Sequence, residues 1–126
     1  MKTIRISKQQ KKSLLLIHLL ELKYGKHIPV NTSFMRLQVE RQLREESTVD
    51  LKLSANHFLV SLRTLADNGF LVFQPNVDRS IDSNARANEN MWQLTDQGRQ
   101  FAETYLSASL RPKRQYIKKI AEVGQS

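Results

Sequence analysis

With 126 residues, 40% of them hydrophobic and 25% charged, the chain suits one globular domain with a modest core and leaves little room for a second. It contains no cysteine, which excludes disulfides, a thiol nucleophile and a cysteine-based zinc site, and its longest apolar run, residues 14–17, is far shorter than the roughly 20 residues of a membrane span. The net charge of +8 favours a polyanionic partner, and because the N-terminus lacks a signal-peptide pattern we expect a cytoplasmic protein with no membrane contact.

The excess of positive charge lies at the two ends of the chain. Residues 1–12, expected as a basic N-terminal arm, contain five basic residues and no acidic one, and residues 111–126, within a basic C-terminal extension over 109–126, contain five against one. The residues between hold 10 basic and 11 acidic side chains. Such ends attract a polyanion, although they would also serve as solubilising tails. The basic residues expected to contact phosphate are Lys8, Lys11, Lys12, Arg111, Lys113 and Arg114.

A first helix is predicted from Ser7, a good N-cap, to about Tyr24, with Gly25 as its stop. Its apolar residues cover most of the helical wheel and leave a narrow polar edge at His18 and Glu21. One domain core rarely needs so wide a face, so the pattern favours burial against a second subunit, although a helix packed on two sides within one domain would show the same pattern. The predicted dimer-interface residues are Leu15, Leu19 and Leu22, with Tyr116, Ile117 and Ile120 from the C-terminal extension.

The next element is a short strand with two candidate positions. Residues 28–30 suit an edge strand, where proline is tolerated, and the alternating apolar residues of 49–53 suit a strand as well. Between the two candidates, residues 33–46 are predicted as a helix because apolar side chains recur every four residues. These side chains are Met35, Val39 and Leu43.

The third helix, over residues 54–68, has the clearest pattern. Ser54 is a suitable N-cap, and Gly69 supplies the left-handed residue that ends the helix. An apolar stripe covers about a third of the wheel and is expected to face the core. The stripe consists of Ala55, Phe58, Leu59, Leu62, Leu65 and Ala66. The opposite side, with Arg63 at its border, carries the other residues that are candidates for contacting a binding partner: Asn56, His57, Val60, Ser61 and Thr64.

Two strands are predicted next, at residues 70–74 and 91–94. The 16 residues that join them contain Arg79 and Arg86 but no glycine, and this loop is expected to be mobile when free. A further helix follows Thr95 and is expected to pack on the first one; its apolar side chains are Phe101, Ala102, Tyr105 and Leu106. Beyond Pro112, a short basic amphipathic helix is predicted, which would dock on a partner subunit or lie along DNA. A membrane surface is the least favoured alternative, because this helix has only one aromatic residue.

Two of these segments resemble a known family. Residues 62–71, Leu-Arg-Thr-Leu-Ala-Asp-Asn-Gly-Phe-Leu, resemble the end of a winged-helix recognition helix, in which a leucine-rich face packs inward and a glycine turns the chain into the wing hairpin. Residues 94–98, Leu-Thr-Asp-Gln-Gly, resemble the Leu-Thr-x-x-Gly signature that closes this hairpin in many bacterial transcriptional regulators. The likeness to the winged helix-turn-helix superfamily covers about residues 12–108. It departs from the family pattern in the long connection at 47–53 and in the long, glycine-free wing.

The resemblance implies a mainly α fold with a small β-hairpin, containing about four to five helices and a two- to three-stranded antiparallel sheet. Residues 13–108 would form the domain, 54–68 its recognition helix and 70–95 its wing. A helix of this kind fits the major groove of DNA, where Asn56 would contact adenine, Arg63 guanine or a phosphate, and Val60 a thymine methyl group. His57, Ser61 and Thr64 would contact bases or phosphates, and Arg79 and Arg86 would enter the adjacent minor groove.

The preferred hypothesis is a homodimeric, sequence-specific double-stranded DNA-binding transcriptional regulator, expected to be a repressor and to be associated with the nucleoid. The alternatives are a winged-helix protein–protein adaptor that uses the same helix, and a replication or partition factor of a mobile element. We expect no enzyme, because the sequence has no phosphate-binding glycine loop, nucleophile elbow or zinc-protease motif. No metal site or cofactor is predicted, and the apolar pattern does not determine whether a small effector binds.

Overall fold

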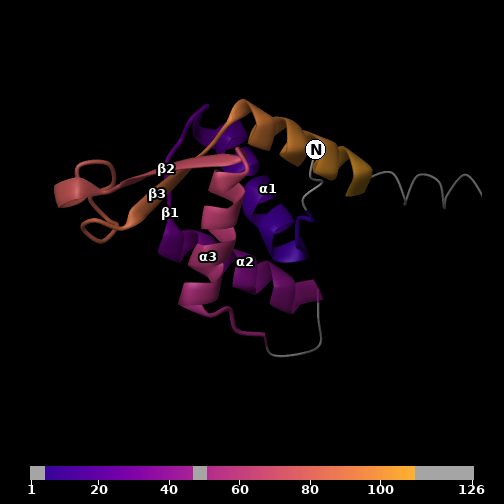
Figure 1. Cartoon of the computed structure of the whole chain (residues 1–126), viewed down its shortest axis with the longest axis horizontal. Helices are drawn as coiled ribbons and strands as arrows, with labels where there is room; N and C mark the ends of the chain where they lie inside the picture. The colour runs from indigo at the N-terminus through magenta and orange to yellow at the C-terminus, as the bar shows by residue number, and fades with distance from the viewer. Residues whose placement is uncertain (1–4, 47–50, 110–126) are drawn as a thin grey trace, which may run out of the picture.

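The computed structural model describes residues 5–46 and 51–109 (Figure 1). The helices are α1 (Lys8–Tyr24), α2 (Thr32–Glu46), α3 (Ala55–Asp67) and a C-terminal helix over residues 96–109. The strands are β1 (Val30–Asn31), β2 (Leu71–Pro75) and β3 (Asn90–Leu94), with a short 3₁₀ helix, η1 (Val77–Arg79), between the last two. The sheet is antiparallel in the order β1–β3–β2. This arrangement confirms the predicted winged helix-turn-helix fold, mainly helical with a small sheet.

The helices form one body, and the β2–β3 hairpin projects from it to the left in Figure 1. The C-terminal helix lies along the top of the same view, near α1. The hairpin is therefore the part of the described fold that extends away from the helical core.

In the described residues, no helix is both long and apolar enough to cross a membrane.

The predicted bounds of α1 are confirmed, but its polar edge lies inside the protein. Ser7 and Gln10 form a reciprocal capping box, and Gly25 ends the helix with φ 126°. His18 and Glu21, which the wheel placed on a narrow polar edge, are only 5% and 6% exposed. The sequence pattern missed this because Glu21 has a partner 78 residues further on, on the C-terminal helix. Three of the exposed side chains of α1 are instead apolar: Leu19, Leu22 and Tyr24.

The first strand overlaps the end of the first of its two candidate positions, residues 28–30. β1 begins at Val30, one residue after Pro29, and pairs with β3 through Val30 and Asn31. Residues 51–53 of the other candidate form no strand, and 49–50 lie outside the described residues. α2 follows β1 directly, because Asn31 Oδ1 accepts the backbone N–H of Phe34 at 2.7 Å and so caps the helix. Of the three apolar residues on which its prediction rests, Met35 and Val39 are fully buried and Leu43 is half-buried.

α3 follows the predicted pattern closely. Ser54 caps its start, and its central inward side chains are completely buried: Phe58, Leu62 and Leu65. Ala55, which the wheel assigned to the inward stripe, is the first residue of α3 and is exposed. Gly69 follows with φ 85°, the left-handed conformation expected of it.

The Leu-Thr-x-x-Gly motif joins the sheet to the C-terminal helix. Thr95 Oγ1 donates a hydrogen bond to the backbone carbonyl of Gly69 and accepts one from the backbone N–H of Gly98, so that it caps the helix and holds the end of α3 at once. A Cβ at Gly98 would lie 2.0 Å from the carbonyl oxygen of Phe70, which leaves no space for a side chain. The glycine of the motif therefore allows the start of the C-terminal helix to lie directly against the backbone that follows α3.

The loop of the wing, residues 76–89, is built around a buried side chain. Asn76 is fully buried; its amide group donates to the carbonyls of Asp82 (2.9 Å) and Arg86 (3.1 Å). Its Oδ1 accepts the backbone N–H groups of Ile81 and Asp82. In place of glycine, Asp78, Arg79 and Asn88 adopt positive φ angles. The prediction of a mobile loop did not anticipate this buried centre.

Candidate nucleic-acid interface

Five of the six predicted contact residues on α3 are exposed. Asn56, His57 and Arg63 make no side-chain hydrogen bond or ion pair with any residue that the structure describes. Val60 is 60% exposed between them. Thr64 is exposed, but its hydroxyl donates to the carbonyl of Val60 at 3.0 Å. The side chains with polar groups available for contact are therefore Asn56, His57 and Arg63.

Ser61, the sixth predicted residue, is engaged by α1. Gln9 Nε2 donates to the Ser61 hydroxyl at 3.2 Å, and Gln10 Nε2 donates to the Ser61 carbonyl at 3.1 Å. The hydroxyl itself donates to the carbonyl of His57. Wheel geometry did not reveal this role, because it depends on where the start of α1 packs. Ser61 thus fixes α3 against α1, and the exposed face of α3 is narrower than predicted.

Residues 51–53, the described part of the long connection before α3, are held by a buried glutamate on α2 and by two arginines of the same helix. Glu40 accepts the backbone N–H of Leu53 at 2.9 Å and a hydrogen bond from Arg44 at 3.0 Å. Arg36 reaches the carbonyl of Leu53 at 3.4 Å, and Arg44 the carbonyl of Leu51 at 2.8 Å. These contacts place the start of α3 relative to α2, as a tight turn does in a shorter helix-turn-helix.

A groove separates the start of α3 from the wing. It has a volume of about 290 Å³ and lies where the first turns of α2 and α3 face the base of the wing loop. Its polar lining includes Ser33, Arg36, Asn56, Arg86, Asn88 and Glu89. The groove brings together two predicted contact residues from different elements, Asn56 of α3 and Arg86 of the wing. Arg36 was not predicted, because the sequence does not show which side of α2 faces the wing.

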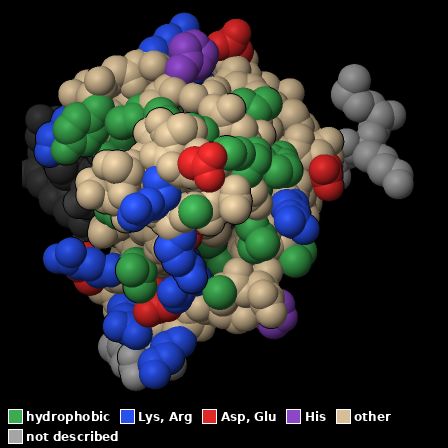
Figure 2. Space-filling view, turned by 90° about the vertical axis from the view of Figure 1, so that its left-hand side faces the viewer, with side chains coloured by type: hydrophobic (Ala, Val, Ile, Leu, Met, Phe, Trp, Pro, Cys, Tyr) green, Lys and Arg blue, Asp and Glu red, His purple; other side chains and the backbone are tan. Residues whose placement is uncertain are grey.

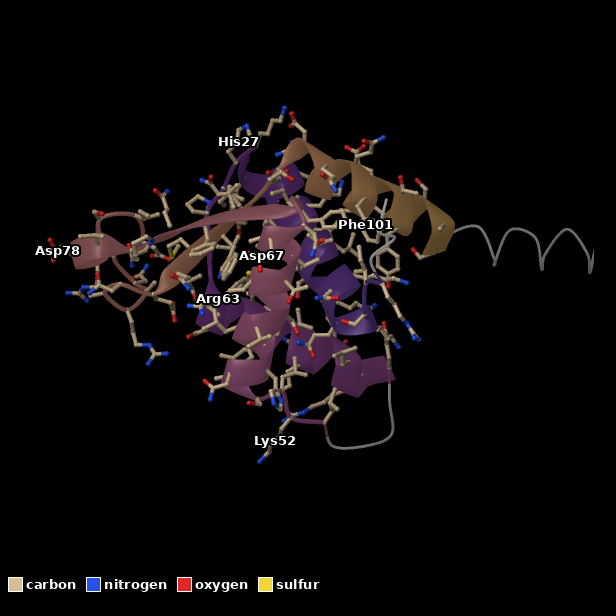
Figure 3. All side chains as sticks on the ribbon, in the orientation of Figure 1. His27, Lys52, Arg63, Asp67, Asp78 and Phe101 are labelled. Carbon is tan, nitrogen blue, oxygen red and sulfur yellow. The ribbon has the colours of Figure 1, made fainter. Side chains whose placement is uncertain are left out.

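The two wing arginines have different surroundings. Arg86 lines the groove; its side chain is 84% exposed, and Nη2 lies 3.2 Å from Ser33 Oγ and 3.6 Å from Glu89. Arg79 is an exposed residue of η1, next to Asp78, which lies at the far end of the hairpin from α3 in Figure 3. The structure therefore brings Arg86 to α3 but not Arg79.

The predicted basic residues of the N-terminal arm have partners within the chain. Lys8 and Lys12 both form ion pairs with Glu46 at the end of α2. Hydrogen bonds from Lys12 and Lys8 lower the pKa of Glu46. Lys11 Nζ lies 5.9 Å from the ring centre of Tyr105. These lysines connect α1 to its neighbours, so part of their charge is compensated. The other predicted phosphate contacts, Arg111, Lys113 and Arg114, lie outside the described residues.

Positive charge is nevertheless gathered on the side of the wing. Figure 2 views the molecule from the side on which the hairpin projects, and Lys and Arg side chains collect over the lower left of this face. Acidic side chains lie among them, so the surface has mixed charge with a basic excess. A surface of this kind suits a polyanion that also makes specific contacts.

Part of the predicted dimer face, the part on α1, lies within the described residues and is exposed to solvent. Leu22 is 67% exposed, Leu19 41% exposed and Leu15 half-buried, and Tyr24 continues the apolar surface at 62%. The other predicted interface residues, Tyr116, Ile117 and Ile120, lie outside the described residues. The exposed side of α1 thus carries the apolar side chains that the wheel assigned to a second subunit.

Comparison with solved structures shows the fold independently. A variant of ZitR from Lactococcus lactis superimposes with a TM-score of 0.57 over 97% of this chain, at 11% identity. PadR from Bacillus subtilis, in complex with operator DNA, superimposes with a TM-score of 0.52 over 79% of this chain, at 18% identity. The chain spans 65% of that ZitR chain and 47% of that PadR chain. No family model and no curated protein sequence matches the chain.

Proposed function

We propose that the chain is a sequence-specific, double-stranded DNA-binding regulator of transcription that acts as a homodimer, with repression as its expected mode. The observation that carries the proposal is the exposed face of α3, on which Asn56 and Arg63 have no partner in the described chain, beside a wing that brings Arg86 to the groove lined by Asn56. An exposed helix with amide and guanidinium groups but no internal partners for them is suited to base edges. The fold that the chain shares with PadR, whose structure contains operator DNA, supports the same partner.

In the proposed complex, α3 enters the major groove. Asn56 makes a bidentate contact to adenine, Arg63 contacts guanine or a phosphate, and Val60 packs on a thymine methyl group. His57 contacts neighbouring bases or phosphates, whereas Thr64, whose hydroxyl donates to the Val60 carbonyl, has no free donor for a phosphate. The wing follows the adjacent minor groove, where Arg86 lies close to α3 and Arg79 further along the hairpin. The basic ends of the chain add phosphate contacts that depend on salt concentration.

A second copy is the proposed occupant of the apolar face of α1. Leu15, Leu19 and Leu22 are separated by four and then three residues, which is the spacing of a coiled-coil seam. Two such faces related by a two-fold axis bury the same side chains from each copy. A dimer of this kind would present two α3 helices to two half-sites about one helical turn apart. Repression follows where such a site overlaps a promoter.

Selection of bound sequences from a random duplex pool tests the proposal. We expect a two-fold symmetric motif with half-sites about one helical turn apart, lost in Asn56→Ala. Gln100→Ala, an exposed substitution on the C-terminal helix, is the matched control and should recover the same motif. Binding that is sensitive to salt but enriches no motif would reduce the basic ends to general polyanion affinity and would favour the adaptor alternative.

A further inference from the structure

The groove beside α3 contains an acidic residue where a DNA-binding surface would be expected to exclude one. The side chain of Glu89 is only 10% exposed, and its carboxylate accepts a hydrogen bond from the hydroxyl of Ser33 in the first turn of α2. A carboxylate removed from water in this way is stable only with partners that hold it. Glu89 is therefore a fixed negative charge in the lining of the groove.

Ser33 joins this carboxylate to Arg86. Its hydroxyl donates to Glu89 and accepts a hydrogen bond from Arg86 Nη2 at 3.2 Å, and the same Nη2 lies 3.6 Å from Glu89 Oε1. Arg86 is otherwise open to solvent, since 84% of its side chain is exposed. One side of the guanidinium thus faces the acid and the other side is free to contact DNA. Arg86 is thus held by Ser33 of α2 and not by a residue of α3.

The position of the acid affects which DNA groups Arg86 can bind well. A backbone phosphate that approaches Arg86 also approaches Glu89, so that repulsion offsets part of the attraction. A neutral acceptor on a base edge is attracted by Arg86 with little repulsion from Glu89. Specific interfaces commonly combine attraction for the correct partner with repulsion of the others. Glu89 therefore weakens the contact of Arg86 with a backbone phosphate, which every DNA sequence offers. It weakens the contact of Arg86 with a base-edge acceptor, which only some sequences offer, to a smaller extent.

Resting on the DNA-binding function above, we propose that Glu89 is a specificity-determining residue. Its charge weakens the capture of backbone phosphate by Arg86 and so lowers the affinity for non-cognate duplex more than the affinity for the cognate site. Ser33 is the positioning residue that fixes Glu89 and Arg86 relative to each other. The competing explanation is that the three side chains only connect the wing to α2.

Glu89→Gln separates the two explanations, because glutamine can still accept the Ser33 hydrogen bond but carries no charge. Dissociation constants are measured over a range of salt concentrations for the selected site and for a random duplex. We expect non-cognate binding to tighten roughly two- to fivefold, the range for an ion pair whose arginine is solvent-exposed. The slope of the logarithm of the binding constant against the logarithm of the salt concentration should steepen by about one. The selected site should change less, so the ratio of the two affinities falls.

The matched control is Glu103→Gln, which makes the same change of charge on the exposed side of the C-terminal helix. It should leave the affinity ratio unchanged. In an Arg86→Ala background, Glu89→Gln should have no effect on the salt slope, because the acid acts through that arginine. An equal response of Glu89→Gln and Glu103→Gln would overturn the inference.

Arg86→Gln supplies a second test that does not depend on the fold of the Glu89 variant. If Glu89 keeps Arg86 from phosphates, this substitution weakens the selected site while the salt slope on random duplex stays nearly constant. A slope that becomes shallower by about one would show that Arg86 already binds phosphate, and would overturn the inference alone. Failure of the wild-type protein to bind any duplex at low salt would instead overturn the proposed function, and this inference with it.

Discussion

Glu21 and Arg99 form a buried, bidentate ion pair between α1 and the C-terminal helix. Arg99 Nε donates to Glu21 Oε1 at 2.7 Å, and Nη2 donates to Oε2 at 2.8 Å. Glu21 Oε2 also accepts the backbone N–H of His27 at 3.0 Å, so that the carboxylate also fixes the turn after α1. The parallel geometry of the two Arg99 hydrogen bonds gives both strength and direction to the packing of the two helices.

Removal of one partner should destabilise the protein strongly. Arg99→Met keeps much of the side-chain volume but leaves the carboxylate of Glu21, whose side chain is 4% exposed, without its cation. An uncompensated buried charge costs about 3–5 kcal/mol of unfolding free energy. Urea denaturation followed by circular dichroism measures the loss. Arg63→Met, at an exposed position, should stay within about 0.5 kcal/mol of wild type, and an equally small effect of Arg99→Met would contradict the expectation.

The same pair should make stability depend on pH in the acidic range. Burial raises the pKa of Glu21, but hydrogen bonds from Arg99 and from the His27 N–H outweigh it and hold the pKa below its ordinary value of 4.5. The ionised form is thus favoured in the folded state. Its contribution is present above the unfolded pKa and is lost as pH falls through the lower, folded pKa.

Urea denaturation between pH 7 and pH 3 is the corresponding measurement. Wild type should lose stability as pH drops below about 4.5, and the difference in stability between wild type and Glu21→Gln should shrink over that range. Glu46 has a lowered pKa as well, but its side chain is 39% exposed, so solvent screening keeps its share small. A constant difference between the two proteins across the range would rule out the assigned role of Glu21.

Gly98 should tolerate no side chain. A Cβ there would lie 2.0 Å from the carbonyl oxygen of Phe70, which belongs to the backbone and cannot rotate away. Gly98→Ala is therefore expected to cost about 3 kcal/mol or more, at the upper end of the range for overpacking. Thermal unfolding provides the comparison with Ser107→Ala, an exposed change on the same helix that should shift the midpoint little. Similar midpoints for the two variants would be inconsistent with the close approach.

Local features of the sequence were sufficient to predict most of the fold. The caps at Ser7 and Ser54, the stop at Gly69 and the apolar stripe of α3 depend on residues within a few positions of one another, and the structure contains all of them. The Leu-Thr-x-x-Gly motif was recognised by resemblance alone. Its physical basis, the contact of Gly98 with Phe70, joins residues 28 positions apart and has no local signal.

The candidate site was predicted less completely, because it depends on which elements meet. A helical wheel identifies a polar side but not its neighbour, so it placed Ser61 with the contact residues although α1 engages it. Arg36 and Glu89 became candidates only when α2 and the wing were seen to line one groove with α3. Asn56 and Arg63 were identified correctly as exposed because nothing in the described chain covers their side of α3.

Asn76 should determine whether the wing loop keeps its shape. Its side chain makes four hydrogen bonds to the backbone of residues 81–86, and Asn76→Ala would leave those buried groups without partners. Hydrogen exchange of residues 76–89 should accelerate at least tenfold, while exchange in α1 changes little. Asn84→Ala, on the exposed surface of the same loop, is the control and should exchange like wild type. Unchanged protection in Asn76→Ala would refute the role of this side chain.

The apolar face of α1 should control oligomeric state without affecting the fold. Leu22 is 67% exposed in the single chain, so Leu22→Lys removes little packing within the domain but would place two charges against each other across a two-fold interface. Analytical ultracentrifugation of the wild type should show a dimer at micromolar concentration, and of Leu22→Lys a folded monomer with a wild-type circular dichroism spectrum. DNA with two half-sites should then bind Leu22→Lys with little advantage over a single half-site, because the second contact is no longer intramolecular.

Val72→Lys introduces a lysine at a half-exposed apolar position on a different element, β2, and should leave the dimer intact. If both variants dissociate, the interface includes the hairpin, and the assignment to α1 alone is wrong. If neither dissociates, α1 is not the contact, and the exposed leucines would need another occupant. A monomeric wild type that still selects one half-site would retain the DNA-binding function of α3 but remove the dimer from the proposal, since a two-fold motif requires two copies of α3.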